Sequence, residues 1–382
     1  MVEGRLRPAW AEIDLDAVAH NVGILRRLVA PAQVCAVVKA DAYGHGAVTV
    51  AGAALEAGAA WLAVALPEEG IELRRAGIQA PVLVLSEPVP GAMAEAVGAG
   101  LTLTVYRPEG VAAAAVAAHA EGRSPLAVHL KVDTGMHRVG ADPGQAVELA
   151  RAVEATGCLR LEGLWTHLAV ADEPRDRFTA GQLRCFEAVR ARLRAAGMSP
   201  PLVHAANSAG ALAHPAARYD LVRCGIAVYG YLPAPEMEGE LRPVLSLRAR
   251  VSMVRELEAG ERPSYGRRRP LPGRAWVATV PLGYADGVPR RLLDGGMVAL
   301  VGGRRRPLAG AVTMDQIVLD CGPEPDVAVG DEVVLLGAQG GERVTADDWA
   351  RALGTISYEV LCGVGRRVPR VPVRGGRPVG AR

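Results

Sequence analysis

Lysine is nearly absent from this chain. The 43 Lys and Arg residues include only two lysines, Lys39 and Lys131. A guanidinium is effectively never deprotonated in a protein, whereas a lysine amine loses its proton when it is buried or placed beside another cation, and can then attack a carbonyl to form a Schiff base. The two lysines are therefore candidates for sites that need a neutral amine. The alternative is that both are ordinary surface charges.

Other absences restrict the class of protein. A net charge of +2 argues against nucleic acid or an acidic membrane as the main partner. No stretch is long and apolar enough to span a bilayer, and acidic residues interrupt the N-terminal region where a signal peptide needs an apolar run. The six cysteines are widely spread, and neither they nor the histidines have the spacing of metal ligands. We therefore expect a cytoplasmic protein with reduced thiols and no metal site.

Short apolar runs predict the fold of the first 240 residues. Eight β-prone runs are separated by segments with helical spacing, many of which end at glycine. These runs are residues 33–40, 60–66, 81–86, 101–105, 126–133, 159–168, 201–207 and 219–230. The alternation predicts an α/β fold, a (β/α)8 TIM-like barrel, with an open doubly wound sheet as the alternative. In a barrel the active site lies at the carboxyl ends of the strands, where Lys39, Lys131 and Asn207 fall.

The pattern changes after a proline-containing connection at residues 231–243. Beyond it, β-prone segments are separated by Gly/Pro turns, and residues 345–354 form one clear helical pattern with Thr345 as its N-cap. We therefore predict two domains, a barrel over residues 1–240 and a mostly-β domain over residues 241–382. The arginine runs at 267–269 and 304–306 are expected in solvated turns.

Several segments resemble the alanine racemases, a family of enzymes that use pyridoxal 5'-phosphate (PLP). They occur in the family's order and cover nearly the whole chain: "AVVKADAYGHGA" (36–47), "VDTGMHRVG", "HAANSAG", "VRCGIAVYG", "VPLGYADG" and "TISYEVLCGVGRRVPR". The resemblance implies that Lys39 forms a Schiff base with PLP, which acts as the electron sink while the protein supplies binding and a base. It also implies a homodimer in which each β domain completes the active site of the other subunit.

The resemblance also places the two bases of a racemase on opposite faces of the substrate, namely Lys39 and the Tyr265 of the partner subunit. A tyrosine, with an unperturbed pKa of about 10, needs nearby positive charge or hydrogen bonds to act as a base. The family names His167 as the hydrogen-bond partner of Tyr265, followed by Arg223, which faces the pyridine nitrogen of PLP. The residues alone leave open a packed core tyrosine at 265 and an Arg223 paired with an acid such as Asp220.

The remaining site residues follow from the same resemblance. Arg138 contacts the substrate carboxylate. Lys131 either carries carbon dioxide as a carbamate that positions Arg138, or stays unmodified and pairs with Asp133. The cofactor-binding residues are Lys39, Tyr43, His167, Asn207, Ser208, Arg223, Gly225, Ile226 and Tyr358. The residues that the partner subunit brings to the active-site entrance are Tyr284, Met314 and Asp315.

The activity that the resemblance implies is interconversion of L-alanine and D-alanine, which supplies D-alanine for peptidoglycan. A racemase of broader range, accepting serine for example, is one alternative, because one small group in an apolar pocket is discriminated by only about 1–3 kcal/mol. A second alternative is a PLP-dependent barrel decarboxylase, but its Gly-Pro-x-Cys-acid segment is not found in the sequence. A third is a non-enzymatic PLP-binding protein built on a lone barrel, against which the long β domain argues.

Overall fold

The computed structural model describes residues 6–234, 237 and 240–379. Two compact units make up the chain. The barrel unit comprises residues 17–42 and 47–242, and the β unit comprises residues 1–16, 43–46 and 243–382. The connection predicted at residues 231–243 lies partly outside the described residues.

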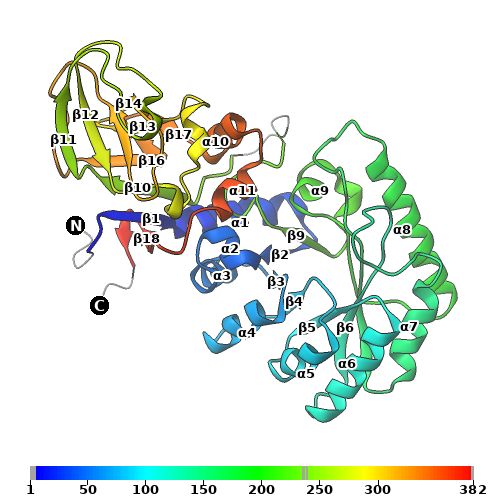
Figure 1. The fold of residues 1–382 in the computed structure, drawn as a ribbon. Helices are drawn as coiled ribbons and strands as arrows, with labels where there is room; N and C mark the ends of the chain where they lie inside the picture. Colours follow the sequence, from blue (N-terminus) through cyan, green and yellow to red (C-terminus); the bar gives the residue numbers. More distant parts are fainter. Residues whose placement is uncertain (1–5, 235–236, 238–239, 380–382) are drawn as a thin grey trace. The chain divides into compact units, whose positions relative to one another are not determined.

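Eight parallel strands form the centre of the barrel unit (Figure 1). Their order is β8-β7-β6-β5-β4-β3-β2-β9, and the sheet is nearly closed because backbone hydrogen bonds from Asp220 to Val203 and from Arg223 to Ala206 join its two edges. Their bounds are β2 (Gln33–Val37), β3 (Trp61–Val64), β4 (Val82–Val84), β5 (Thr102–Val105), β6 (Leu126–Lys131), β7 (Leu159–Trp165), β8 (Leu202–His204) and β9 (Leu221–Cys224). These strands are apolar and mostly buried, as parallel strands covered by helices are.

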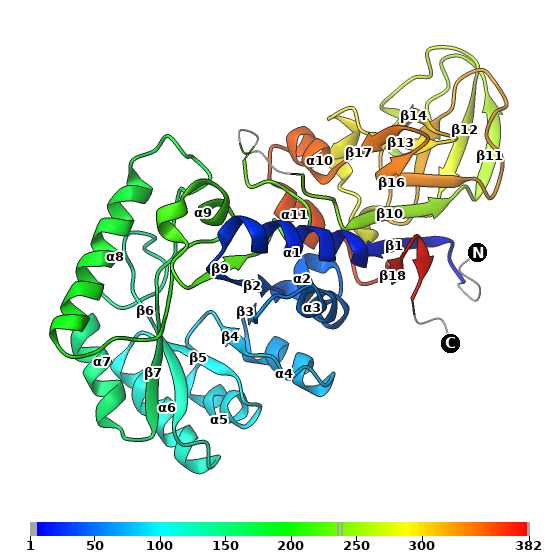
Figure 2. The same cartoon turned by 180° about the vertical axis from the view of Figure 1, so that it is seen from behind.

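Helices alternate with these strands, and Figures 1 and 2 show α4 to α8 on the outside of the sheet. The helices are α1 (Leu15–Val29), α2 (Lys39–Gly44), α3 (Ala47–Glu56), α4 (Pro67–Arg75), α5 (Pro90–Gly98), α6 (Pro108–Ala120), α7 (Ala146–Ala155), α8 (Phe178–Ala195), α9 (Ser208–Ala213) and the short 3-10 turn Pro215–Ala217. Three of them begin with proline, which suits the first helical position because its missing N–H would have no partner there.

The predicted barrel is confirmed, and the open doubly wound sheet is not found. All eight predicted runs contain a strand of the barrel, but several strands end sooner than the apolar runs do. β2 ends at Val37, two residues before Lys39, and β8 ends at His204, three residues before Asn207. Lys39 and Asn207 therefore lie beyond the ends of their strands, whereas Lys131 is the last residue of β6.

The β unit contains two sheets. One sheet has the order β14-β13-β16-β10-β1-β18-β19, with β17 paired to β16, and the other has the order β11-β12-β15. The strands are β1 (Ala9–Asp14), β10 (Leu245–Arg250), β11 (Met253–Leu257), β12 (Ala275–Val280), β13 (Val298–Val301), β14 (Arg304–Pro307), β15 (Ile317–Asp320), β16 (Glu332–Gln339), β17 (Glu342–Val344), β18 (Arg370–Arg374) and β19 (Arg377–Pro378). The helices are α10 (Ala346–Leu353) and α11 (Ser357–Cys362), with 3-10 turns at Tyr265–Arg267, Tyr284–Asp286 and Arg290–Leu293.

The N-terminal strand β1 belongs to the β unit rather than to the barrel. It pairs antiparallel with β10 and parallel with β18, so residues more than 230 positions apart in the sequence lie side by side in one sheet. An apolar run of six residues carries no information about such a distant partner. This pairing is why the structural division of the chain differs at residues 1–16 from a boundary drawn along the sequence.

Two smaller predictions about the β unit have opposite outcomes. Thr345 is confirmed as the N-cap of α10, because its side chain accepts a hydrogen bond from the Asp348 N–H. The placement of residues 304–306 in a solvated turn is wrong. They form β14, and Arg306 is buried, where it pairs with Asp326 at 2.6 Å.

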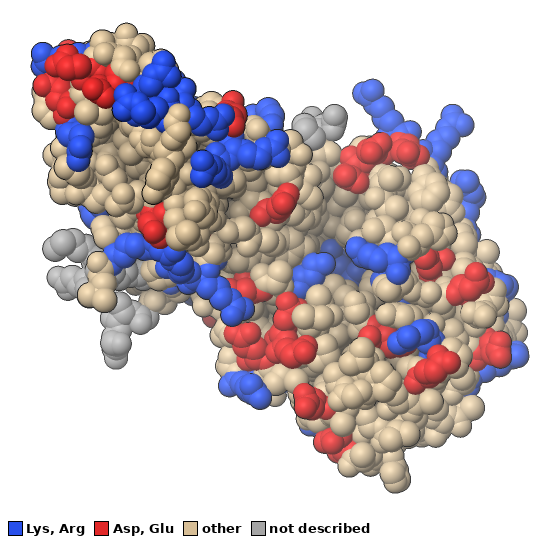
Figure 3. Space-filling model, viewed as in Figure 1, with Lys and Arg blue, Asp and Glu red and all other residues tan. Residues whose placement is uncertain are grey.

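Charge is mixed on the visible face of the barrel unit (Figure 3). On the face of the barrel unit seen in Figure 3, acidic and basic side chains are interspersed rather than gathered into one basic field. Among the described residues, no helix is both long enough and apolar enough to cross a membrane.

Candidate active site

Lys39 begins an unusual turn at the carboxyl end of β2. The following four residues, Ala40 to Tyr43, all have φ between 53° and 54°, so α2 turns left-handed. Each such residue costs about 1–2 kcal/mol when it is not glycine. The Glu69 carboxylate, on α4, stabilises the turn by accepting hydrogen bonds from the N–H groups of Ala40 at 2.6 Å and Ala65 at 2.8 Å. Strain that the surroundings hold in place is typical of functional sites, and here it fixes the backbone at Lys39.

Cationic side chains converge at the mouth of the barrel. Burial, together with the smaller effects of the charges of Arg223, Arg138 and Lys39, lowers the pKa of Lys131 to about 7. Burial also lowers the pKa of His167 well below its usual value, and the same three cations act on it together with Lys131. The structure therefore brings together the two lysines and both arginines that the sequence analysis selected. At neutral pH His167 is uncharged and the Lys131 amine is partly deprotonated.

Arg223 lies on β9 and is almost fully buried. Its Nη2 donates to the carbonyl oxygens of Thr166 at 2.9 Å and Ala205 at 3.0 Å, and to His167 Nδ1 at 3.3 Å. Burial lowers the pKa of Arg223 to about 10, so the guanidinium remains protonated at neutral pH. Because arginine can only donate, His167 accepts at Nδ1 and carries its proton on Nε2. That proton is the one His167 can offer to another group.

Lys131 and Arg223 share an aromatic partner. The Lys131 Nζ lies 4.4 Å from the centre of the Trp165 ring, and the Arg223 Cζ lies 4.5 Å from it. The carboxylate of Asp133 accepts hydrogen bonds from the backbone of Gly135 and His137. No ion pair between Lys131 and Asp133 is found in the described part of the chain. The Lys131 amine is thus held against a ring, with cations nearby that favour its neutral form.

Ser208 and the loop after β9 form the polar side of the mouth. The Ser208 Oγ accepts hydrogen bonds from the backbone N–H of Gly225 at 2.9 Å and of Ala227 at 3.3 Å. Asn207 caps α9, since its side-chain oxygen accepts the Gly210 N–H at 2.9 Å. The hydroxyl of Ser208 and the backbone around Ile226, both predicted to bind the cofactor, are therefore close together. Backbone N–H groups and a hydroxyl are suitable donors for an anion.

Gln182, which the sequence analysis did not select, ties two loops of the mouth together. From α8 its amide donates to the carbonyl of His167 at 3.0 Å and to Thr134, and its oxygen accepts the Ala169 N–H at 2.9 Å. Gln182 is buried. Nothing in its local sequence marks it, because its role depends on loops that follow β6 and β7.

Three candidate side chains of the β unit are unusually exposed for apolar or aromatic residues. Tyr265 is 70% exposed, Tyr284 is 42% exposed and Met314 is 52% exposed. Tyr265 follows Ser264, whose φ of 70° is a left-handed value that a non-glycine residue rarely adopts. The backbone of Pro263 is so close to Gly310 that a side chain there would clash. The tyrosine is therefore presented to the outside by a constrained turn rather than by a loose loop.

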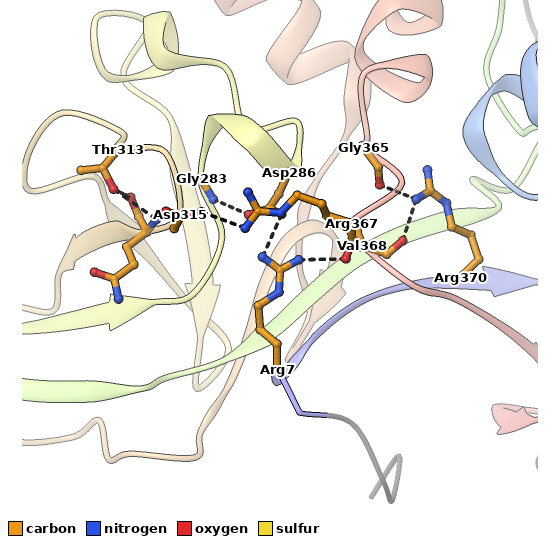
Figure 4. A network of polar contacts seen from close by, with 10 residues as sticks. Arg7, Gly283, Asp286, Thr313, Asp315, Gly365, Arg367, Val368 and Arg370 are labelled. Carbon is orange, nitrogen blue, oxygen red and sulfur yellow. Dashed lines mark hydrogen bonds and ion pairs between the residues drawn. The ribbon is translucent and has the colours of Figure 1, made fainter.

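A buried carboxylate holds the loops that carry Tyr284 and Asp315 (Figure 4). Asp286 is fully buried, and its Oδ1 lies 2.8 Å from Arg7 Nη1 and 3.4 Å from Arg367 Nε. Its Oδ2 accepts the backbone N–H of Gly283, and Arg367 also pairs with Asp315 at 2.7 Å. Arginines from the two ends of the chain thus anchor both loops of the predicted entrance.

Tyr43 and Tyr358, both predicted to bind the cofactor, lie together in the β unit. Their ring centres are 6.1 Å apart. Arg370 donates to the Gly44 carbonyl at 2.8 Å, which fixes residues 43–46 to the C-terminal part of the chain. A side chain at Gly44 would meet the Leu361 carbonyl at 2.8 Å, so only glycine allows this close approach.

The donor set of the barrel mouth fits PLP. Among the groups that most shift the pKa values of Lys131 and His167, only Asp133 is acidic, and its carboxylate already accepts backbone hydrogen bonds. A cluster with this excess of positive charge favours an anionic ligand, and the phosphate of PLP supplies one. The amine of Lys39, held on its fixed turn, is the type of group that binds an aldehyde covalently.

A nearly closed parallel barrel that carries an amine on a strained turn, together with a β unit that exposes tyrosines, defines a two-domain barrel enzyme. Family models for the alanine racemase N-terminal and C-terminal domains match residues 13–233 and 244–372. Over 370 residues the chain is 49% identical to an alanine racemase of Symbiobacterium thermophilum and 46% identical to one of Nostoc, with at least 96% of each chain covered. The chain belongs to the alanine racemase family and is an isomerase.

Solved structures agree with this assignment. The alanine racemase of Streptomyces lavendulae superposes with a TM-score of 0.91 at 42% identity, covering 98% of both chains. The Bacillus anthracis alanine racemase with bound L-Ala-P superposes with a TM-score of 0.91 at 38% identity, covering 98% of this chain and 97% of the other. The decarboxylase and the non-enzymatic alternatives considered from the sequence are therefore not favoured.

Proposed function

We propose that this protein interconverts L-alanine and D-alanine with PLP as its cofactor. The observation that carries the proposal is the amine of Lys39 on a left-handed turn at the mouth of a cation-rich barrel. When bound, PLP supplies the electron sink that makes the α-proton of an amino acid removable. The resemblance to alanine racemases over the full chain supports alanine as the substrate.

Two side chains move the proton, one on each face of the substrate. Lys39 serves one face from the barrel. Tyr265 of the partner subunit serves the other, which requires a surface-exposed tyrosine such as the one found here, 70% exposed in the single chain. A neutral His167 with its proton on Nε2 can donate a hydrogen bond to the Tyr265 oxygen, and a phenolate that accepts such a bond is easier to form. Two bases are needed because one base would return the proton to the face it left.

The other residues bind and orient. Arg223 donates hydrogen bonds toward the ring nitrogen of the cofactor and cannot give up its own proton. The phosphate is held by the hydroxyl of Ser208 and the backbone of Gly225 and Ile226, with Asn207 shaping the loop and the hydroxyls of Tyr43 and Tyr358 as further donors. These small donors leave room for the anion.

Arg138 binds the carboxylate of the substrate, and Lys131 positions it. The neutral Lys131 amine adds to carbon dioxide and loses one proton, which gives a carbamate with one negative charge. Such a group accepts hydrogen bonds from a guanidinium in the bidentate manner of a carboxylate. A pKa of about 7 provides the neutral amine that this addition requires.

The active protein is a homodimer in which each β unit completes the other subunit's site. Tyr284, Met314 and Asp315 line the entrance of the partner's site, which accounts for the exposure of Tyr284 and Met314 in one chain. The protein acts in the cytoplasm, without nucleic acid or membrane as partner, and its D-alanine product enters peptidoglycan synthesis.

The test is Tyr265→Phe with α-proton exchange followed separately for the two enantiomers in deuterated water. Exchange from one enantiomer should fall by at least about 100-fold, the lower end of what a positioned acid or base contributes, and exchange from the other far less. Tyr106→Phe, which removes a phenol of the barrel outside the site, is the matched control and should leave both rates unchanged. Equal and mild losses for both enantiomers would remove Tyr265 from the role. Borohydride reduction and digestion should place the cofactor on the peptide that contains Lys39 and on no other.

A further inference from the structure

A row of buried polar side chains continues from Arg223 across the strands of the barrel. The Arg223 Nη1 lies 2.8 Å from His204 Nδ1, on β8, and the His204 Nε2 lies 3.0 Å from His129 Nδ1, on β6. The His129 Nε2 lies 3.4 Å from a carboxylate oxygen of Glu162, on β7. Both histidines are fully buried, whereas the Glu162 side chain is 18% exposed. Glu162, His129 and His204, here called the relay, take no part in the site described above.

The chemistry of these groups determines which nitrogen of each imidazole carries the proton. Arginine has donors only, so His204 must accept at Nδ1 and carry its proton on Nε2. That proton points at His129 Nδ1, which must therefore accept, and the proton of His129 lies on Nε2, facing the carboxylate of Glu162. Burial lowers the pKa of both histidines, which keeps each imidazole neutral with a single proton. The proton order thus leads from a cation to an anion through two hydrogen bonds and a final ionic contact of 3.4 Å, in which His129 Nε2 faces Glu162 without forming a hydrogen bond.

Arg223 needs such an arrangement because it is a buried cation. Its hydrogen-bond partners in the described part of the chain are two carbonyl oxygens and two neutral imidazoles. An uncompensated buried charge is costly, and neutral partners offset only part of that cost. The carboxylate of Glu162 is at the far end of the relay, where the nearby His129 and Arg160 lower its pKa and keep it ionised. Hydrogen bonds in a low-dielectric interior polarise one another, so the two imidazoles can transmit its charge.

Packing fixes the relay in place. The His204 ring stacks on Trp165 at an angle of 11°, and the His129 ring lies 5.4 Å from the centre of Trp61. Gly163 lies beside His129 in the sheet, and a side chain there would come within 2.4 Å of the imidazole. These contacts hold the ring planes in the orientation that the relay needs.

We propose that Glu162, His129 and His204 are positioning residues that orient the guanidinium of Arg223 and compensate its charge through two neutral imidazoles. The proposal rests on the proposed function in one respect only, the identity of the group that Arg223 faces. The relay itself lies entirely within the barrel unit. Its consequence is that Arg223 presents fixed, fully protonated donors at the mouth. A substitution at the partly exposed Glu162 should then alter the orientation and charge compensation of Arg223, although Glu162 does not contact the site.

The first test reads the tautomers directly, in the protein with and without PLP. With ¹⁵N-labelled histidine, and with His129→Gln and His204→Gln used for assignment, both imidazoles should show one protonated nitrogen, Nε2. Neither should titrate from about pH 6 to about pH 9, because an ordinary histidine titrates near the lower end of this range. A proton on Nδ1 of either ring, or a second proton gained in this range, would overturn the proposal.

The second test asks whether charge passes along the relay. Glu162→Gln keeps the shape and still places an oxygen opposite His129 Nε2, but removes the negative charge. Glu148→Gln removes an exposed carboxylate elsewhere in the barrel unit and is the matched control. The ¹⁵N signals of His204, which Glu162 does not contact, should shift in Glu162→Gln and stay unchanged in Glu148→Gln. Unchanged His204 signals in Glu162→Gln, with melting as in the wild type, contradict the proposal.

The third test concerns the reaction. Glu162→Gln should lower kcat in both directions by about 10-fold, the size typical when the partner that orients a site residue is removed, with little change in KM. Glu148→Gln should match the wild type. A Glu162→Gln protein with normal kcat in both directions would overturn the positioning role. If the wild-type protein itself lacked racemase activity, the proposed function would fail, and the two tests on the histidines would still decide for or against the relay.

Discussion

At the scale of single residues, Lys131 shows why this arginine-rich chain retains a lysine. The residue is 3% exposed, and its amine lies against Trp165 with Arg223 and Arg138 nearby, so its charged form is disfavoured. An arginine in this place would remain charged and could not add to carbon dioxide. The environment of this amine thus gives a physical reason for a lysine at position 131 in a chain that otherwise uses arginine almost everywhere.

The lowered pKa of Lys131 predicts a pH dependence of stability. The unfolded chain holds this proton up to its ordinary pKa of 10.5, whereas the folded chain releases it at about 7. Between these values the unfolded state binds more protons, so this group makes the free energy of unfolding rise with pH, by at most about 1.4 kcal/mol per pH unit for one proton. Urea unfolding of the cofactor-free protein in carbon-dioxide-free buffer should show this rise relative to Lys131→Met. Parallel curves for the two proteins would contradict the prediction.

At the scale of elements, the site depends on loops that other elements hold. Glu69 on α4 stabilises the left-handed turn of α2, and Gln182 on α8 ties the loops after β6 and β7. In the β unit, Asp286 does the same for the loops of Tyr284 and Asp315. Glu69 and Gln182 are side chains of helices that supply hydrogen bonds an irregular backbone cannot make for itself, whereas Asp286 belongs to the turn that it stabilises.

Asp286→Asn should loosen the loops of the β unit. The variant loses the charge-assisted hydrogen bond from Arg7, a type of bond that contributes about 1.5–3 kcal/mol, and the ion pair with Arg367. We expect the free energy of unfolding of the β unit to fall by about 2 kcal/mol. The matched control is Asp294→Asn, which removes the exposed pair with Arg268 and should cost under about 1 kcal/mol. Hydrogen exchange of the amides around Tyr284 should rise in Asp286→Asn only, and equal effects of the two variants would count against this role.

At the scale of the whole molecule, a shared active site predicts that two inactive variants restore activity together. Lys39→Ala and Tyr265→Phe should each be nearly inactive. When they are co-expressed and assort at random, half of the dimers are mixed, and each mixed dimer has one intact site of two, which gives about a quarter of wild-type activity. Activity no higher than that of the separate variants, with dimers present by size measurement, would mean that each site is built within a single chain.

Comparison of sequence and structure separates two kinds of information. The barrel could be predicted because its strands are short, nearly continuous apolar runs, a local signal that buried parallel strands carry. Lys39 could be found because lysine is rare and because its segment resembles that of a known family. Glu69, Gln182, Asp286 and the relay could not be found this way, since their partners lie far away in the sequence and no local pattern marks them.

The amino-acid sequence by itself determined which chemistry is available: two amines in a chain of guanidiniums, a tyrosine at position 265, and apolar runs spaced for a barrel. Only the tertiary structure decided the state of those groups, such as the lowered pKa of Lys131 and the proton positions on His167 and His204. It also decided that the first strand pairs with β10 and β18. The reason is that charge, burial and hydrogen bonding act through space, between residues whose distance along the chain says nothing about their contact.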